Sequence, residues 1–501
     1  MFKRNTIANY CSQLYIAALN ILLVPIYVDT LGIESYGIIG LYAMVQIWLQ
    51  LLDLGLTPAL SREAAKANNG SLLDKACYKK LHRRVSIFFF ASSFILAAIG
   101  IILSPFVAEK LITKSLDLST IEYCLTCISI CVAFRWISNP YRSVLVGIEK
   151  QVQLAIVNFM VATLRLPGSL LVIYIYRDIE SYFTFQIFVS ILEPLVLSFL
   201  AKHTLNEAIP KVACLGKTEY SAYQSKVLKF ALGISFTASA WVVISQTDKL
   251  LLSGLITVSE YGYYTMAVVA ANMVTFIAQP FSQSLLPKLI AVESKSCQNE
   301  FVTEYINGTK FISALVIPCS LILAVYSKEL VYIWSGDLET TRSVSGIVTW
   351  YSLGNLFLSL SAFAYYIQYV KGNIRLHIIG NIIYLLILVP GVYYFANHDG
   401  ALGVAKFWLY HNFAYFIVWT AIVHKQFLAG CHLKWLIQGV LQFFPVSLLM
   451  ILLAVKSDLI SQDRLLGLFQ FSLLGMMMLM INYYIYKYGI RTIVLMSFLK
   501  R

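Results

Sequence analysis

Several ionisable side chains stand within long apolar stretches of this sequence. Arg165 lies near the middle of one stretch, and Asp248 and Lys249 lie near the end of another. A charge at membrane depth costs about 2.5 to 3.5 kcal/mol on insertion scales, so it normally faces a cavity or a partner. These residues therefore indicate a polar cavity or an ion pair inside the helix bundle.

Each of these residues also has a simpler interpretation. Arg165 could form a structural ion pair with Glu193, and Arg135 could extend its side chain to the nearby interface. Neighbours on a helix point about 100° apart, so one of Asp248 and Lys249 could line a cavity while the other pairs elsewhere. We predict that Arg165, Lys249 and Arg135 contact the transported molecule. Coupling or gating is predicted for Asp248 and Glu193.

Asp53 closes the second apolar stretch, which is expected to run from about 38 to 59. Gly55 and Pro58 disturb a helix there and free backbone groups that Asp53 or Arg62 can satisfy. For Asp53 and Arg62 we therefore favour a structural or gating latch over contact with a ligand.

The elements that carry these residues are long and apolar. Fourteen apolar stretches, joined by short polar connectors, run from Ile7 to Tyr486, and roughly 20 residues of helix cross a hydrocarbon core. The composition, 59% hydrophobic and 13% charged, is too apolar for a water-soluble core of this length. We predict an all-α polytopic membrane protein with 14 transmembrane helices.

The formal net charge of +13 follows membrane topology and does not indicate nucleic-acid binding. Most of the 38 Lys and Arg lie on alternate connectors, among them 61–85 and 202–228, and at both ends of the chain. By the positive-inside rule these connectors are cytoplasmic. A multi-pass protein with both termini in the cytoplasm is therefore expected.

The sequence contains an internal repeat at an offset of about 225 residues. Ile33-Glu34-Ser35-Tyr36-Gly37 matches Val258-Ser259-Glu260-Tyr261-Gly262, and Gly147 matches Gly372; further matches pair Asn158, Pro167 and Gly168 with Asn381, Pro390 and Gly391. The matching features stand six stretches apart, so the halves share one membrane orientation and form a parallel repeat. Arg165 is matched by Leu388, so packing of the repeat does not require a charge at that position.

The repeat also predicts the domain organisation. Two six-helix lobes around a central cavity are expected at 1–201 and 229–425, joined by a cytoplasmic linker at 202–228. Two additional transmembrane helices and a cytoplasmic tail follow at 426–501.

Metal and enzyme signatures are weak. Cys124, Cys127 and Cys131 share one helix face, but no His or further Cys pair completes a metal site, so a packing role is favoured and no metal is predicted. Because no phosphate loop or His-Glu-x-x-His motif occurs, we predict a gradient-driven transporter and not an enzyme. No cofactor is expected; H⁺ or Na⁺ is the candidate coupling ion.

Short motifs in both halves carry a family resemblance. They are Asn20 to Pro25, Leu31-Gly32-x-x-x-Tyr36-Gly37, Leu52-Asp53-Leu54-Gly55-Leu56, Arg62-Glu63, and Asp248-Lys249-Leu250-Leu251-Leu252-Ser253-Gly254 followed by Tyr261-Gly262. Together they resemble the polysaccharide flippases (Wzx type, for O-antigen or capsule) of the MATE-like MOP exporter superfamily. The resemblance covers essentially the whole chain.

The resemblance implies two six-helix lobes around a cavity open to one side at a time. It implies that an undecaprenyl-diphosphate-linked oligosaccharide moves from the cytoplasmic to the periplasmic leaflet of the bacterial inner membrane, for O-antigen, capsule or lipopolysaccharide assembly. The implied partners are that lipid-linked oligosaccharide, membrane lipids, and a polysaccharide polymerase with its chain-length regulator. The family's cavity is typically cationic, which Arg165 and Lys249 match best.

Two other functions remain open from the sequence. A cation-coupled drug or small-molecule exporter of the same fold would favour carboxylates in its cavity. A non-transporting scaffold of a glycan-assembly complex would not need Arg165, so full activity of an Arg165→Ala chain would favour it.

Overall fold

The protein is almost entirely helical. The computed structural model describes residues 2–111, 116–208, 217–293, 298–373, 375–457, 460–461 and 463–489, and within these it contains no strand. The centre of the predicted linker, 209–216, and the predicted tail from 490 onwards lie outside the described residues. The helical fold class expected from the sequence is confirmed.

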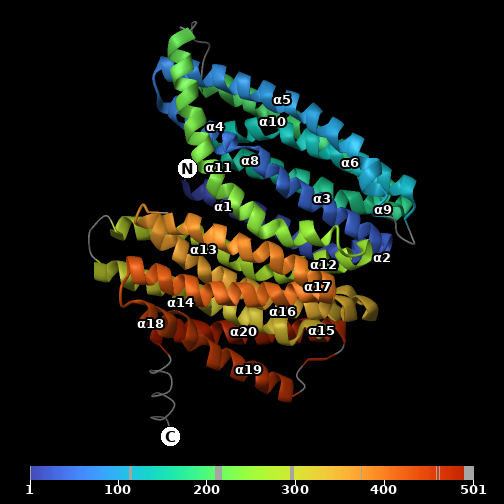
Figure 1. The fold of residues 1–501 in the computed structure, drawn as a ribbon, viewed down its shortest axis with the longest axis vertical. Helices are drawn as coiled ribbons and strands as arrows, with labels where there is room; N and C mark the ends of the chain where they lie inside the picture. The colour runs from blue at the N-terminus through green and yellow to red at the C-terminus, as the bar shows by residue number, and fades with distance from the viewer. Residues whose placement is uncertain are drawn as a thin grey trace. The chain divides into compact units, whose positions relative to one another are not determined.

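The chain packs as two compact units, Met1–Gly262 and Tyr263–Arg501. In the first unit α6 packs between α5 and α10, α1 packs on α8, and α11 packs on α3 and α4 (Figure 1). Its elements are α1 (Phe2–Leu22), α2 (Val24–Leu31), α3 (Ile33–Leu52), α4 (Leu56–Asn69), α5 (Leu72–Ala108), α6 (Leu118–Ile137), α7 (Asn139–Gly147), α8 (Gln151–Thr163), the π-helical turn η1 (Leu164–Gly168), α9 (Ser169–Tyr176), α10 (Ile179–Ala208) and α11 (Lys217–Leu252).

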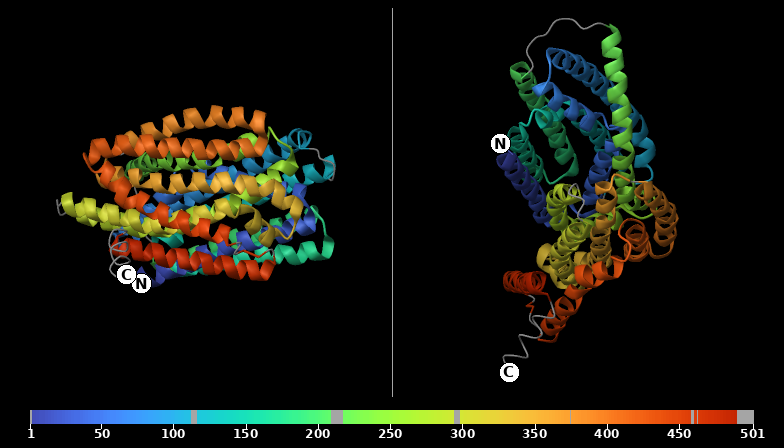
Figure 2. Two further views of the ribbon diagram at one scale, coloured as in Figure 1. Left: turned by 90° about the horizontal axis from the view of Figure 1, so that it is seen from below. Right: turned by 90° about the vertical axis from the view of Figure 1, so that its left-hand side faces the viewer.

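The second unit is built around α16, which packs along both α14 and α17. Its elements are most of α12 (Val258–Ala271), α13 (Met273–Glu293), α14 (Gln298–Val325), α15 (Ser327–Ser335), α16 (Leu338–Val370), α17 (Arg375–Phe427), α18 (His432–Trp435), η2 (Leu436–Val440), η3 (Leu441–Phe443), α19 (Phe444–Lys456) and α20 (Arg464–Tyr488). The run named α17 consists of two helical arms, coloured orange in Figure 2, because Gly400 has a non-helical backbone (φ 58°, ψ −145°).

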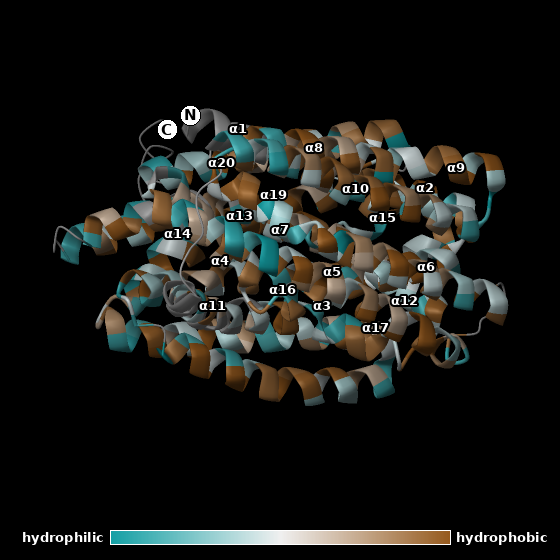
Figure 3. Cartoon of the chain, turned by 90° about the horizontal axis from the view of Figure 1, so that it is seen from above, coloured by the Kyte–Doolittle hydropathy of each residue, from teal (hydrophilic) through white to brown (hydrophobic). Residues whose placement is uncertain are grey.

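Twelve helical segments among the described residues are long and apolar enough to cross a membrane. One of them, Arg375–Phe427, covers two of the predicted stretches, and α11 covers the predicted seventh stretch without being one of the twelve. Figure 3 shows the hydrophobic stretches along helices such as α8 and α9. The chain is thus a multi-pass membrane protein, while the count of fourteen spans and the two six-helix lobes stay predictions.

The second apolar stretch ends earlier than expected. Helix α3 stops at Leu52, because the turn that follows includes Gly55 with φ of 69°. The Asp53 carboxylate accepts hydrogen bonds from the backbone N–H of Thr57 (3.2 Å) and from its hydroxyl (2.5 Å). A Cβ atom at Gly55 would lie 2.2 Å from the Ala231 carbonyl oxygen in α11. Asp53 therefore satisfies the first turn of α4, as the sequence suggested for freed backbone groups.

The starts of α3 and α12 contact each other through matching glycines. A Cβ atom at Gly37 would lie 2.5 Å from the carbonyl oxygen of Val258, and one at Gly262 would lie 2.4 Å from that of Ile33. Each helix thus presents the same residue position to the other. The parallel repeat itself stays a prediction.

A second pair of glycines matched by sequence is not equivalent in structure. Helices α7 and α16 end in the same hydrogen-bond pattern, in which three successive N–H groups bond to carbonyls four, three and five residues back. The donors are Ile148, Glu149 and Lys150 in one helix, and Lys371, Gly372 and Asn373 in the other.

This pattern matches Gly372 (φ 70°) with Glu149 (φ 60°) and not with Gly147. The interval is the one that separates Asn158 from Asn381. The sequence alignment of Gly147 with Gly372 was therefore wrong by two residues, because it followed residue identity and not the position of the helix end.

Glu149 is expected to be strained where its counterpart is relaxed. A left-handed backbone costs an L-residue with a side chain roughly 1 kcal/mol, and glycine almost nothing. Glu149→Gly should therefore raise the unfolding temperature, and Gly372→Ala, which has no atom within 4 Å of the new Cβ, should lower it by a similar amount. Thermal unfolding of the two purified variants checks this, and shifts of the same sign would contradict it.

Candidate functional site

A cavity of about 540 Å³ lies among the helices of the first unit. The charged residues that line it are Arg135, Arg142, Arg165 and Glu193. Its amide-bearing lining residues are Asn20, Gln46, Gln50, Asn139 and Asn158. A volume of this size falls within the range of small-ligand pockets.

Three arginines converge on one carboxylate in this cavity. Glu193 of α10 is buried, and its Oε1 is bonded by Nη2 of Arg142, while its Oε2 lies 3.0 Å from Nη2 of Arg165 and 3.7 Å from Nε of Arg135. The arginines come from α6, α7 and η1, and only the fold brings them together. One carboxylate cannot neutralise three guanidinium groups, so the cluster keeps an excess of two positive charges.

The π-helical turn η1 positions Arg165. Pro167 has no N–H and disturbs the α-helical ladder here. Carbonyl groups of the turn are satisfied from other helices: Gln186 Nε2 donates to the carbonyl oxygen of Arg165 (2.9 Å), and the Tyr27 hydroxyl donates to that of Leu166 (2.8 Å). These bonds fix the backbone from which the guanidinium reaches Glu193.

The two interpretations of Arg165 both have a structural basis. Its side chain pairs with Glu193, as the structural interpretation expects, yet it also lines the cavity, as the functional one expects. Leu388, matched to it by the repeat, is fully buried in the second unit. Arg135 also lines the cavity, as its predicted contact with the transported molecule requires.

Sequence reasoning did not include Arg142 among the site residues. Arg142 was not singled out because it lies near the predicted membrane interface. In the structure, the helix breaks at Ser138 and the separate helix α7 begins, which turns Arg142 into the cavity. Its Nη1 donates to Oδ1 of Asn158 (2.6 Å). Asn158 belongs to the repeat match, and that was the one signal that could have drawn attention to this contact.

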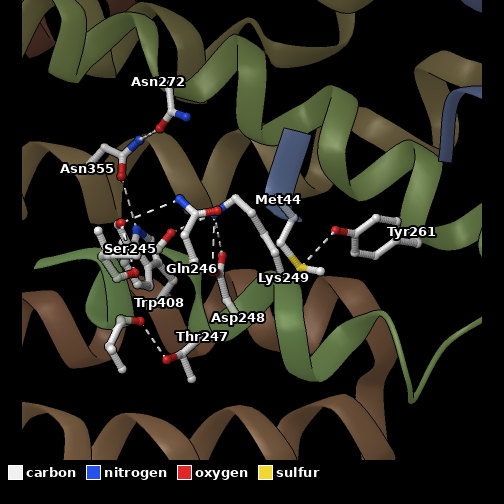
Figure 4. A network of polar contacts seen from close by, with 12 residues as sticks. Met44, Ser245, Gln246, Thr247, Asp248, Lys249, Tyr261, Asn272, Asn355 and Trp408 are labelled. Carbon is white, nitrogen blue, oxygen red and sulfur yellow. Dashed lines mark hydrogen bonds and ion pairs between the residues drawn. The ribbon is translucent and has the colours of Figure 1, made fainter. Parts of the chain in front are cut away.

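Asp248 and Lys249 pair with each other, as Figure 4 shows. The Lys249 Nζ lies 3.2 and 3.3 Å from the two carboxylate oxygens and donates to the carbonyl oxygen of Ser245 (2.9 Å). We expected the two side chains to face different surroundings, but the long lysine side chain folds back over its own helix. Neither residue is among the described residues that line the cavity, so the predicted substrate contact of Lys249 is not part of this site.

Figure 4 also shows a neutral network within the second unit. Nδ2 of Asn355 donates to Oδ1 of Asn272, and Nε1 of Trp408 donates to Oδ1 of Asn355, both at 3.1 Å. Every partner is an amide or an indole, so the network joins α16 and α17 without an ionisable group.

Asp53 and Arg62 are not among the described residues that line the cavity. Nη1 of Arg62 lies 3.6 Å from Oε1 of Glu63, which also accepts a hydrogen bond from Lys66 (2.6 Å). The other oxygen of Glu63 accepts from the hydroxyl of Tyr223 in α11 (3.0 Å). These contacts tie α4 to α11, and gating by Asp53 or Arg62 stays a prediction.

The described residues contain no group of three or more His, Cys, Asp or Glu placed to hold a metal ion. Cys124, Cys127 and Cys131 are buried free thiols on α6. Their positions suit packing against neighbouring helices.

The long apolar helices and the charged internal cavity together define a multi-pass membrane protein with a polar cavity inside its helix bundle. Residues 2–292 match the family described as "Polysaccharide biosynthesis protein", and the chain belongs to this family. A comparison with curated protein sequences found no match. The resemblance drawn from the sequence motifs is thus confirmed at the level of the family.

Solved structures share the fold. The chain superposes on the lipid II flippase MurJ in an inward closed conformation, with a TM-score of 0.68 and 16% identity over 96% of this chain and 98% of that one. An inward-facing multidrug resistance MATE family transporter of the MOP superfamily gives 0.65 and 14% over 82% and 95%. A MATE transporter of Vibrio cholerae gives 0.59 and 12% over 84% and 95%. At these identities the flippase and the transporters show the fold of this chain.

Proposed function

We propose that this protein moves an undecaprenyl-diphosphate-linked oligosaccharide from the cytoplasmic to the periplasmic leaflet of the bacterial inner membrane, for O-antigen, capsule or related polysaccharide assembly. The observation that carries the proposal is the convergence of Arg135, Arg142 and Arg165 in one cavity with a single carboxylate. Hydrocarbon does not solvate a diphosphate, so the head group needs a cationic path while its prenyl chain stays in lipid. Arginine forks bind phosphate oxygens in pairs.

The amide groups of the cavity support a sugar attached to that diphosphate. Gln46 and Gln50 stand one turn apart on α3, so their side chains share a helix face, and Asn20 and Asn139 line the same cavity. An amide both donates and accepts hydrogen bonds, which suits sugar hydroxyls. The cavity thus offers charged donors for a diphosphate and neutral partners for the sugar beside it.

The membrane potential can drive this movement. With the cell interior negative, outward transfer of about two negative charges gains roughly 4 to 5 kcal/mol per 100 mV. Asp248 stays the candidate carrier of a coupling ion, H⁺ or Na⁺, and such an ion would compete with the ammonium of Lys249. We expect delivery to a polysaccharide polymerase and chain-length regulator, with both termini of the protein in the cytoplasm.

A drug exporter of the same fold is the second candidate, favoured by the likeness to multidrug transporters. The positive excess of the cavity disfavours cationic drugs. The multidrug transporter covers 82% of this chain and the lipid II flippase 96%. Such a difference is expected if the predicted helices of 426–501 are an addition to a twelve-helix exporter core.

Reconstitution tests the proposed function. Purified protein in liposomes should move a fluorescent undecaprenyl-diphosphate-linked sugar between leaflets, measured by its exposure to an impermeant quencher, and an inside-negative potential should speed outward movement. A fluorescent phosphatidylcholine, which is zwitterionic, should not move. Equal movement of both lipids, or transport of a cationic dye with neither lipid moving, would contradict the proposal.

A further inference from the structure

Glu193 occupies the donors that a diphosphate would need. Its Oε1 takes a hydrogen bond from Arg142, and its Oε2 takes one from Arg165 at 3.0 Å, with Arg135 at 3.7 Å. The Glu193 side chain is only 2% exposed. Without a bound anion, the cavity therefore already holds an anionic group at the centre of its three cations.

The arginines differ in how fully this carboxylate engages them. Their side-chain exposure falls from 33% at Arg135 to 26% at Arg142 and 12% at Arg165. The Nε of Arg165 is buried and has no hydrogen-bond partner among the described residues. Within the described part of the chain, Arg135 makes only the 3.7 Å contact with Glu193. Arg135 and Arg165 thus keep N–H donors that Glu193 does not occupy. Because Arg135 is the most exposed of the three arginines and Arg165 the least, an incoming phosphate meets Arg135 first and Arg165 last.

Full engagement of all three guanidinium groups by a phosphate requires Glu193 to give up hydrogen bonds. The carboxylate also repels a second anion placed beside it, and in a site shielded from water this repulsion is stronger than in bulk solvent. Glu193 must therefore weaken the binding of an anion in this cavity. A transporter needs such a limit, because a substrate held too tightly is not released.

We propose that Glu193 is an internal competitor for the substrate diphosphate, and that its return to the arginines promotes release. The inference rests on the proposed function, since it takes the diphosphate as the ligand of this cavity. It separates two roles within one cluster: the arginines capture the anion, and the carboxylate sets how long it stays.

Binding and turnover of Glu193→Gln test the competitor role. In nanodiscs, with empty nanodiscs as the blank, this variant should bind farnesyl diphosphate about tenfold more tightly than the unchanged protein. Reconstituted into liposomes, it should move the lipid-linked sugar more slowly at saturating substrate. If Glu193 had a purely structural role, Glu193→Gln should lower both the affinity for farnesyl diphosphate and the rate at which the lipid-linked sugar moves. Glu180→Gln, which alters the exposed glutamate near the start of the same helix, is the matched control and should change neither.

Removing one partner of a buried ion pair can prevent folding. Glu193→Asp keeps the charge but withdraws it by one methylene, and it should bind the probe severalfold more tightly. Unchanged or weaker binding by a folded Glu193 variant, with binding still lost in Arg165→Ala, would overturn the competitor role and leave the proposed function intact. No binding of farnesyl diphosphate by the unchanged protein would overturn both.

Discussion

Arg165→Ala should abolish delivery of the lipid-linked glycan to the periplasmic face while protein levels stay near normal. A hydrogen bond to a charged group contributes about 1.5 to 3 kcal/mol, so loss of the fork should weaken capture by one to two orders of magnitude. Arg165→Lys should rescue only partly, because an ammonium keeps the charge and loses the paired donors. Glycan display on cells, measured beside the amount of protein in the membrane, checks this.

The control is a variant that removes a positive charge outside the cavity. Arg375→Ala removes an exposed arginine at the start of α17 and should leave display unchanged. If Arg165 served only to pair with Glu193, its loss would lower protein abundance, and replacing both residues by leucine would restore abundance and display together. Under our proposal, abundance stays near normal in both the single and the double variant, and display is lost in both. Normal display with Arg165→Ala would remove this residue from the mechanism.

Gly147→Leu should prevent stable accumulation of the protein. Helix α7 crosses α4 at this glycine, where a Cβ atom would lie 2.3 Å from the carbonyl oxygen of Ser61 and 2.4 Å from the Cβ of Ala64. The buried small residues Ala59, Ala64 and Ala67 let the helices approach closely. Because backbone blocks the new side chain, the helices must separate, at a cost of about 1 to 3 kcal/mol or more.

Gly475→Leu is the matched control for this prediction. Gly475 lies inside helix α20, where a Cβ atom would have no described atom within 4 Å, so leucine there should be tolerated and favour the helix by up to about 1 kcal/mol. The amount of folded protein, followed by size-exclusion chromatography on heating, measures both. Equal behaviour of the two variants would show that close approach at Gly147 does not matter.

The sequence could predict those features that depend on local composition. Long apolar stretches must become helices in a membrane, because hydrocarbon cannot satisfy an open backbone, and this predicted the fold class. Short motifs around Tyr36, Asp53 and Tyr261 pointed to the family that residues 2–292 confirm. Arg165 could be singled out because a charge at membrane depth is costly wherever the chain places it.

The sequence misjudged features that depend on backbone geometry. The position of the helix end, and not the identity of a residue, made Glu149 the counterpart of Gly372. The reach of a lysine side chain, which a helical wheel omits, allowed Lys249 to pair with its own neighbour Asp248.

Membrane insertion, helix formation and the costly charge at Arg165 were determined by the sequence itself, since each follows from residues close together in the chain. Only the tertiary structure decided that Arg135 from α6, Arg142 from α7 and Arg165 from η1 meet at Glu193 of α10. The physical reason is that such a meeting depends on where α7 breaks away after Ser138, how the π-helical turn rotates Arg165, and how α10 packs against both. These are properties of packed helices, and no local pattern of residues encodes them.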